Sequence, residues 1–208
     1  MQEPRAPVVS VYEPRAETLH GHFGLTYNTS GSLMFEDASM SGTSGNFNGE
    51  YEVELENSFG YSVGVTYSPR HSWGFNIGVA GDFKRRVKSE KATQSGYEPA
   101  EYTLTEDYYV RFTYLNANAI YRWDNFYLPF GLNYAVMNSD DELYLFKHAT
   151  SNPGVQAGVG FYANDFLAFE FLIQATSFRT GGVSNSGDYY ELGTGTFVTG
   201  SLALKIVP

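Results

Sequence analysis

The chain of 208 residues contains no cysteine, which argues against a disulfide scaffold, a CxxC redox site and a thiolate metal site. Charged residues make up only 17%, against about 25% in an ordinary globular protein. The formal net charge is -10, whereas a nucleic-acid-binding protein is normally basic. No apolar run approaches the roughly 18 residues of a membrane-spanning helix, and the mean hydropathy is -0.29.

Aromatic residues and glycine are abundant instead, with 17 Tyr, 16 Phe and 22 Gly. From residue 19 onwards, bulky apolar residues alternate with small or polar ones, which is the period of a β-strand. This alternation predicts eight strands and no helix. The predicted strands cover residues 19–28, 51–67, 73–83, 108–123, 126–136, 154–163, 167–178 and 196–206.

The strands predict a closed barrel whose bulky face points outward. Between Phe59 and Phe83 one face carries Phe, Tyr, Val, Trp and Ile, and the other carries mainly Gly, Ser, Thr and Asn. Eight strands leave an interior just wide enough for side chains to fill, so the small polar face suits the lumen. In the fourth strand both phases are plausible, and we place Leu115, Ala117, Ala119 and Tyr121 outside. An outward face without charges requires lipid as its solvent.

The connections between these strands alternate in length. Short ones follow strands two, four and six, and long polar ones follow the others, for example residues 30–50 and 84–101. Short periplasmic turns and long extracellular loops are typical of a transmembrane β-barrel. Several aromatic residues lie next to the short turns and form a predicted interfacial girdle. They are Tyr67, Trp73, Tyr121, Trp123, Phe126 and Phe166.

Phrases such as "YLNANAIYRW…FYLPFGLNYA" and "NPGVQAGVGFYANDFLAFEF" resemble the eight-stranded outer-membrane barrels of the OmpA/OmpX/OmpW type from Gram-negative bacteria. The resemblance extends over about residues 19–207 and implies an all-β, antiparallel, up-and-down transmembrane barrel. It also implies contact with outer-membrane lipids, lipopolysaccharide and the barrel-assembly machinery. One departure is the C-terminal "LALKIVP", because these barrels usually end in an aromatic residue.

Residues 1–18 are rich in proline and charge, and we expect them to form a periplasmic N-terminal tail outside the barrel of residues 19–208. The N-terminus "MQEPRAPVV" has no basic head followed by an apolar run. We therefore expect that a signal peptide has already been removed and that the protein lies in the bacterial outer membrane.

Six charged residues share the inward phase: Glu56, Asp82, Lys84, Arg122, Glu170 and Lys205. Buried charges have to be paired, so we expect an ion-pair network that plugs the lumen. The expected pairs are Glu56 with Lys84, and Glu170 with Lys205 or Arg122, with Gly160 making room for the Glu170 carboxylate. An alternative is a gate for small ions.

Three further clusters are candidate sites. His148 and Ser151 in "FKHATSNPG" are similar to the H-x-S-N motif of lipid A deacylases, but their spacing is one residue too long and "SNPG" is a turn signal in its own right. His20 and His22 lack a third metal ligand, so lumen packing is expected there instead. The basic run "KRRVKSEK" indicates a solvated loop, or a contact with lipopolysaccharide phosphates.

These features favour a monomeric, non-enzymatic outer-membrane barrel with an occluded lumen and a structural or loop-mediated recognition role. We expect no cofactor, no metal and no nucleic-acid partner. The alternatives are a narrow passage for small or hydrophobic solutes, as in OmpW-like barrels, and then a lipid A-modifying esterase.

Overall fold

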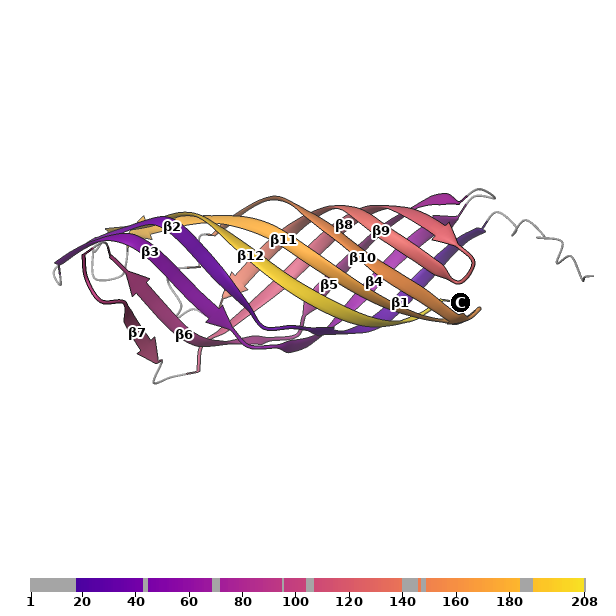
Figure 1. Ribbon diagram of the computed structural model, residues 1–208, viewed down its shortest axis with the longest axis horizontal. Helices are drawn as coiled ribbons and strands as arrows, with labels where there is room; N and C mark the ends of the chain where they lie inside the picture. The colour runs from indigo at the N-terminus through magenta and orange to yellow at the C-terminus, as the bar shows by residue number, and fades with distance from the viewer. Residues whose placement is uncertain are drawn as a thin grey trace, which may run out of the picture.

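The computed structural model describes residues 18–42, 45–68, 72–94, 96–103, 107–139, 146, 149–183 and 189–207. In these residues the chain is almost entirely antiparallel β-structure, arranged as a long tube (Figure 1). The strands are β1 Thr18–Asn28, β2 Gly31–Gly42, β3 Gly45–Leu55, β4 Ser58–Ser68, β5 Trp73–Asp82, β6 Arg85–Thr93, β7 Ala100–Thr103, β8 Tyr109–Trp123, β9 Phe126–Ser139, β10 Thr150–Asn164, β11 Leu167–Val183 and β12 Tyr189–Ile206.

Eight of these strands form a closed ring, which we call the basal barrel. Strands β1, β4, β5, β8, β9, β10, β11 and β12 pair in this order, and β12 pairs back to β1 from Ile206 opposite Phe23 to Ser201 opposite Asn28. The short turns β8–β9 and β10–β11 lie at the same end of the tube as the start of β1 (Figure 1). The predicted all-β, antiparallel class is therefore confirmed, and the pairing of β12 with β1 closes this ring.

The strand count differs from the prediction because the tube continues well beyond the basal barrel. Strands β2, β3 and β6 continue the lines of β1, β4 and β5 in space. Each pair is separated in the chain by a short interruption, at Thr29–Ser30, Glu56–Asn57 and Phe83–Lys84 respectively. Strands β2, β3 and β6 are inserted between β12 and β8 in the order β12–β2–β3–β6–β8, and β7 pairs with the edge of β6. We call this continuation the extension and the level of the three interruptions the junction. Residues 30–50 and 84–93, expected to be loops, thus lie largely in strands.

The basal barrel has an apolar outer surface and a polar interior. Its exposed side chains are Leu19, Phe23, Leu25, Phe59, Val63, Val65, Phe75, Ile77, Leu115, Phe130, Leu132, Val155, Phe169, Phe171, Ile173, Val198, Leu202, Leu204 and Ile206, among others. In β12 this apolar face runs from Val198 to Ile206, close to the 9–11 residues that cross a bilayer. The exposed Leu115, Ala117 and Tyr121 confirm the phase chosen for the fourth strand.

In the extension this arrangement is inverted. Its interior is a closed apolar core in which Phe35, Phe112, Phe178 and Phe197 are at most 1% exposed. Phe112 and Phe197 stack with their ring centroids 4.8 Å apart. The outer face carries charged residues of both signs, notably Glu50, Glu52, Glu54, Arg86 and Lys88. An apolar core inside a charged surface is the arrangement of a protein in water.

In the three interrupted strands, the inversion follows from a one-residue change of phase. Asp82 points inward, Phe83 and Lys84 both point outward, and Arg85 points inward again. In the same way, Leu55 and Ser58 are both buried although the two residues between them are not. Because side chains alternate with a period of two, one extra residue moves the following set to the opposite face. The prediction of one uninterrupted strand over residues 51–67 is therefore wrong, because β3 ends at Leu55 and β4 begins at Ser58 in the opposite phase.

Candidate functional site: a closed lumen with an ion pair at the junction

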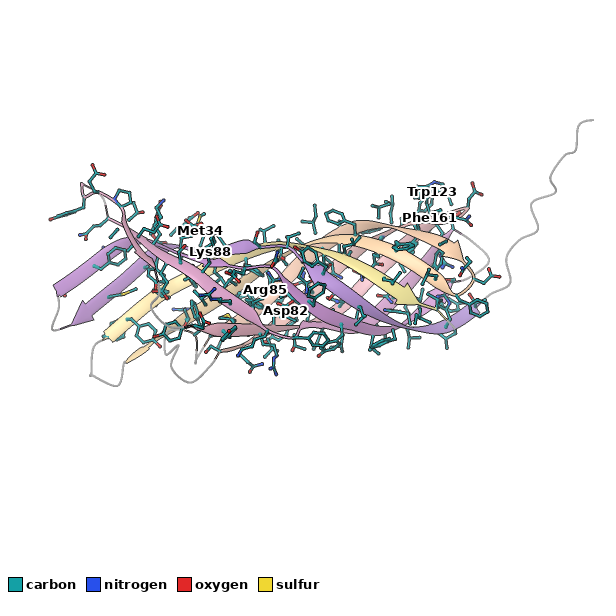
Figure 2. All side chains as sticks on the ribbon, turned by 90° about the horizontal axis from the view of Figure 1, so that it is seen from below. Met34, Asp82, Arg85, Lys88, Trp123 and Phe161 are labelled. Atoms are coloured by element: carbon teal, nitrogen blue, oxygen red, sulfur yellow. The ribbon has the colours of Figure 1, made fainter. Side chains whose placement is uncertain are left out.

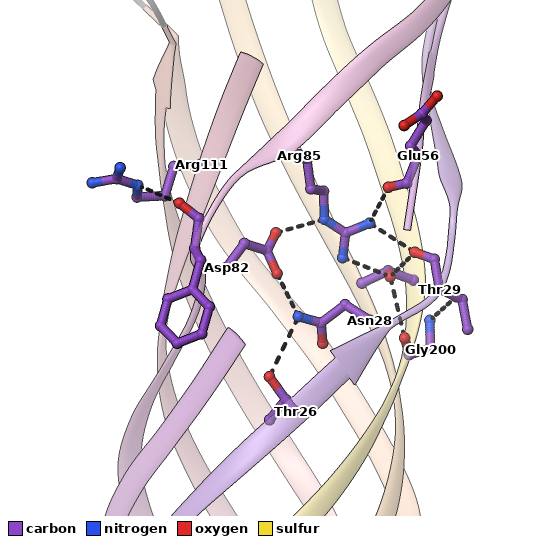
Figure 3. A network of polar contacts seen from close by, with 10 residues as sticks. Thr26, Asn28, Thr29, Glu56, Asp82, Arg85, Arg111 and Gly200 are labelled. Atoms are coloured by element: carbon purple, nitrogen blue, oxygen red, sulfur yellow. Dashed lines mark hydrogen bonds and ion pairs between the residues drawn. The ribbon is translucent and has the colours of Figure 1, made fainter. Parts of the chain in front are cut away.

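Arg85 closes the tube at the junction, and its side chain is fully buried (Figure 3). Its Nε lies 2.5 Å from Oδ2 of Asp82, and Nη2 donates to the hydroxyl of Thr199 at 3.2 Å. Asn28 donates from its amide to the other carboxylate oxygen of Asp82 at 2.5 Å. The guanidinium also lies 5.3 Å from the ring centroid of Phe197, at the base of the apolar core.

The guanidinium also compensates for the interrupted strands. Its Nη1 donates to the backbone carbonyl of Thr29 at 2.7 Å, and the carbonyl of Glu56 lies at 3.5 Å. Both carbonyls belong to interruptions, where they have left the regular ladder. Since an unpaired buried carbonyl costs about as much as a lost hydrogen bond, Arg85 supplies donors where the sheet lacks them.

Below the junction, amide side chains form a hydrogen-bonded ladder along the inner wall of the lumen. Asn118 donates to Asn76 at 3.3 Å, Gln156 donates to Asn118 at 2.6 Å, and Gln174 donates to Gln156 at 2.9 Å. Asn76 in turn donates to the hydroxyl of Thr66 at 3.0 Å. The ladder links β4, β5, β8, β10 and β11 around the inner wall, mostly between directly paired residues, and only the bond of Gln156 to Asn118 skips a strand, β9. These amides fill part of the lumen with hydrogen-bonded side chains.

A second buried ion pair lies nearer the short turns, where Lys205 contacts Glu170. The two residues are on neighbouring strands β12 and β11, and both side chains are at most 10% exposed. Gly160 does lie opposite Glu170, but the space beside it is occupied by Tyr127, whose ring would lie 2.0 Å from a Cβ at this glycine. Gly160 therefore accommodates an aromatic ring rather than the carboxylate.

Arg122 closes the end of the lumen near the short turns. It donates to the Ser68 hydroxyl at 2.6 Å and to the Tyr162 hydroxyl, and its guanidinium lies 4.6 Å from the Tyr162 ring centroid. It forms no ion pair with Glu170 in the part of the chain that the structure describes. Of the two partners expected for Glu170, the structure places Lys205 there.

The expected pair of Glu56 and Lys84 is not present. Tyr61 lies opposite Gly81 and Tyr67 opposite Phe75, so Glu56 falls level with Arg86, two residues beyond Lys84. Glu56 is partly exposed and lies 3.6 Å from Arg86. Lys84 points outward, because the phase changes at this point, and its Nζ lies 3.4 Å from the ring centroid of Tyr109. The inward cation of the junction is Arg85, which the sequence analysis had assigned to a loop.

The remaining space inside the basal barrel is small. A cavity of about 30 Å³ lies between Asp82, Tyr114 and Lys205, and one of about 10 Å³ lies between His20, His22 and Glu170. A single water needs about 10–15 Å³ on this measure, so the larger cavity holds about two waters. These two cavities leave no room for a solute larger than a few waters in the parts of the lumen that they occupy.

The aromatic side chains of the predicted girdle lie on the outer surface near the short turns. Trp73 packs against Tyr121 with centroids 5.1 Å apart, and Trp123 stacks on Phe126 at 5.8 Å. Tyr67 packs on Phe75, and Phe166 is 67% exposed. Figure 2 shows Trp123 and Phe161 at this end of the tube, Met34 and Lys88 at the other, and Asp82 with Arg85 between them.

The other sequence candidates lie as follows. His148 is outside the described residues, and Ser151 is in β10 opposite Phe178. His20 and His22 lie on the lumen side of β1. No group of three potential metal ligands occurs among the residues described. No helix in the described part of the chain is long and apolar enough to span a membrane.

Comparison with known proteins places this geometry among outer-membrane barrels. No protein-family model and no curated protein matches the sequence. The solid-state NMR structure of the outer membrane protein AlkL in lipid bilayers matches with a TM-score of 0.53 and 11% identity, covering 100% of this chain and 97% of that one. The outer membrane protein OprG of Pseudomonas aeruginosa matches with a TM-score of 0.44 and 12% identity, covering 89% of this chain and 95% of that one. The match to AlkL, together with the closed ring and its apolar outer face, shows that the chain has the fold of an outer-membrane β-barrel.

Proposed function

We propose that this protein is a non-enzymatic component of the bacterial outer membrane that carries a folded platform at the cell surface for recognition. The observation behind this proposal is the inversion of polarity at the junction. The basal barrel has the outer surface of a lipid-embedded body, and the extension has that of a body in water. The short turns belong to the opposite end, which matches the periplasmic side of bacterial barrels.

In this proposal the polar side chains inside the basal barrel stabilise the fold and do not form a path for a solute. Two buried ion pairs and the amide ladder hold the eight strands together from inside. The extension is then rigidly coupled to the membrane anchor, because β8 and β12 are continuous through the junction. The recognition surfaces would be the outer face of the extension and the connections at its end.

Orientation can be tested because the chain has no natural cysteine. Thr194→Cys places a thiol on the exposed outer face of the extension, and Asp165→Cys places one in the exposed β10–β11 turn. A membrane-impermeant maleimide should label the first variant on intact cells and the second only after the outer membrane is permeabilised. The reverse pattern would contradict the proposed orientation.

A second candidate function is a passage for small apolar solutes, favoured by the apolar interior of the extension. The fully buried Arg85 and the amide ladder stand in the way of such a path. Planar-bilayer recordings should show no large, steady conductance, and vesicles containing the protein should take up an apolar fluorescent dye no faster than empty vesicles. Porin-like steps, or faster dye entry, would favour the passage over the platform.

A further inference from the structure

We propose that the outer wall formed by β4, β5, β8 and β9 binds a phosphorylated, multiply acylated lipid of the outer leaflet, of the lipid A type. An apolar groove in this wall would hold acyl chains, and Lys84 with Arg111 would hold phosphate. This inference rests on the outer-membrane location proposed above.

The groove is an open depression of about 640 Å³ in the lipid-facing surface. Its walls are the side chains of Val65, Ile77, Leu115 and Leu132, and it extends to Pro153 on β10. Its depth comes from Ala117, a small residue that pairs with Ile77 on one side and Leu132 on the other. Because a single methyl group stands between bulkier neighbours, the surface is hollow along the strands, which suits an extended hydrocarbon chain.

Two cations lie at the outer margin of the same wall. Arg111 shares the outward face of β8 with Leu115, four residues away, so its Cα lies about 13 Å beyond the groove at about 3.3 Å per residue. The Nε of Arg111 donates to the carbonyl of Phe83 at 3.0 Å, which fixes the guanidinium beside Lys84. Figure 3 shows the Arg111 side chain directed away from the barrel.

Among the residues that the structure describes, these two cations differ from their neighbours in having no acidic partner. Arg86 lies 2.6 Å from Asp107, and Lys88 lies 2.7 Å from Glu54. Within the described ranges, no carboxylate forms an ion pair with Lys84 or Arg111. Lys84 instead contacts the face of the Tyr109 ring. In a protein with net charge -10, two unpaired cations at the level where lipid headgroups begin are complementary to phosphate.

The groove and the cations together specify the ligand. Apolar chains alone would fit any lipid, and an exposed cation pair alone would fit any anion. A phosphate group and acyl chains joined in one molecule, with the headgroup further from the membrane centre, match both features and their order along β8. A second copy of this chain is the competing occupant of the groove, but it would leave the two cations without a counter-charge.

The test uses the full chain folded in phosphatidylcholine nanodiscs, with purified bisphosphorylated, hexa-acylated lipid A as the probe. Native mass spectrometry measures the fraction of protein that retains lipid A. We expect wild-type protein to retain the probe at least about tenfold better than its dephosphorylated form, because charge-assisted hydrogen bonds would be lost. Equal retention of the two forms would overturn the phosphate site.

Matched variants separate the two parts of the site. Lys84→Ser with Arg111→Ser should remove the phosphate preference, whereas Lys88→Ser with Arg179→Ser, at paired cations of the extension, should keep it. Ala117→Phe should fill the groove and reduce retention, whereas Ala157→Phe, exposed on β10 outside the groove, should not. Equal loss in a variant and its control, or an Ala117→Phe effect on oligomeric state alone, would overturn the inference. Heat-dependent gel mobility reports folding separately, so a failure to insert into lipid would count against the proposed function instead.

Discussion

At the scale of single residues, Arg85 has the most demanding position in the molecule. It is fully buried, it is paired with a buried carboxylate, and it supplies donors to carbonyls from two interrupted strands. The cost of burying two charges is large, so such a pair is weak evidence of net stabilisation. Removing one member of the ion pair is strongly destabilising, because the charge of the other member stays buried without a counter-charge.

Replacing Arg85 with Met should therefore lower the free energy of unfolding by roughly 3–5 kcal/mol. The measurement is urea unfolding of the protein in lipid vesicles, followed by tryptophan fluorescence. Arg86→Met is the matched control, since Arg86 is 46% exposed and its loss should cost less than about 1 kcal/mol. Adding Asp82→Asn to Arg85→Met should restore part of the stability. A penalty for Arg85→Met as small as that of the control would contradict this account.

The second buried pair makes a similar prediction nearer the short turns. Glu170→Gln and Lys205→Met should each destabilise the barrel by roughly 3–5 kcal/mol, and the double variant should lose less than the sum of the two. A double-mutant cycle in the same unfolding assay measures this coupling. If the two losses of unfolding free energy were strictly additive, water would have to solvate each charge on its own. The lumen would then contain more water than the volumes of its cavities allow.

At the scale of strands, the proposed orientation places lipid around one side of the junction and water around the other. The same substitution at an outward-facing position should therefore affect membrane insertion differently in the basal barrel and in the extension. Ile77 and Met34 are both outward-facing and about half exposed, at 55% and 47%, but Ile77 lies in the basal barrel and Met34 in the extension.

Ile77→Arg should block insertion or cost roughly 2–4 kcal/mol, as a cation on the lipid face does near the bilayer midplane. Met34→Arg should insert normally, because its side chain would be in water. The fraction of protein that becomes resistant to protease in lipid vesicles measures insertion. If the two variants inserted equally well, the assignment of lipid and water to the two parts of the tube would have to be abandoned.

The extension also makes a prediction of its own. Phe197→Ala removes a ring that is 1% exposed and stacked on Phe112, so a cavity should open in the apolar core at a cost of roughly 3–5 kcal/mol. Because the basal barrel has its own polar lumen network, limited proteolysis should cut the extension first and leave a membrane-protected fragment. Phe171→Ala, on the lipid face of β11, is the control and should not expose the extension.

Strand alternation predicted the basal barrel well and the extension poorly. Residues 59–67, 73–79 and 126–136 carry uncharged bulky faces that only lipid explains, and they lie on the outside as predicted. Residues 31–42 and 85–93 alternate too, but their polar face is the outer one and the phase changes just before them. A rule that searches for uncharged outer faces treats such segments as loops. The register of β4 with β5 also depends on a turn whose length the sequence does not specify, which is why Glu56 was paired with Lys84.

At the scale of the whole molecule, the structure combines two bodies with opposite polarity on one continuous set of strands. Strand β12 has 18 residues, of which those from Val198 to Ile206 are enough to cross the membrane. In the proposed orientation, the remainder of β12 raises the extension out of the bilayer. Stability of the two parts should be coupled through β8 and β12, while their responses to solvent should differ.

The two tryptophans of the chain, Trp73 and Trp123, both lie in the aromatic girdle at the end with the short turns. Tryptophan fluorescence should therefore report on a single depth in the membrane, because both indole rings lie at the same end of the barrel. Lipids brominated near the headgroup should quench this emission strongly, and those brominated at the chain ends should quench it weakly. A change confined to the distant extension would leave the spectrum unaltered, so any spectral shift would report on the end of the barrel with the short turns, which is the periplasmic end in the proposed orientation.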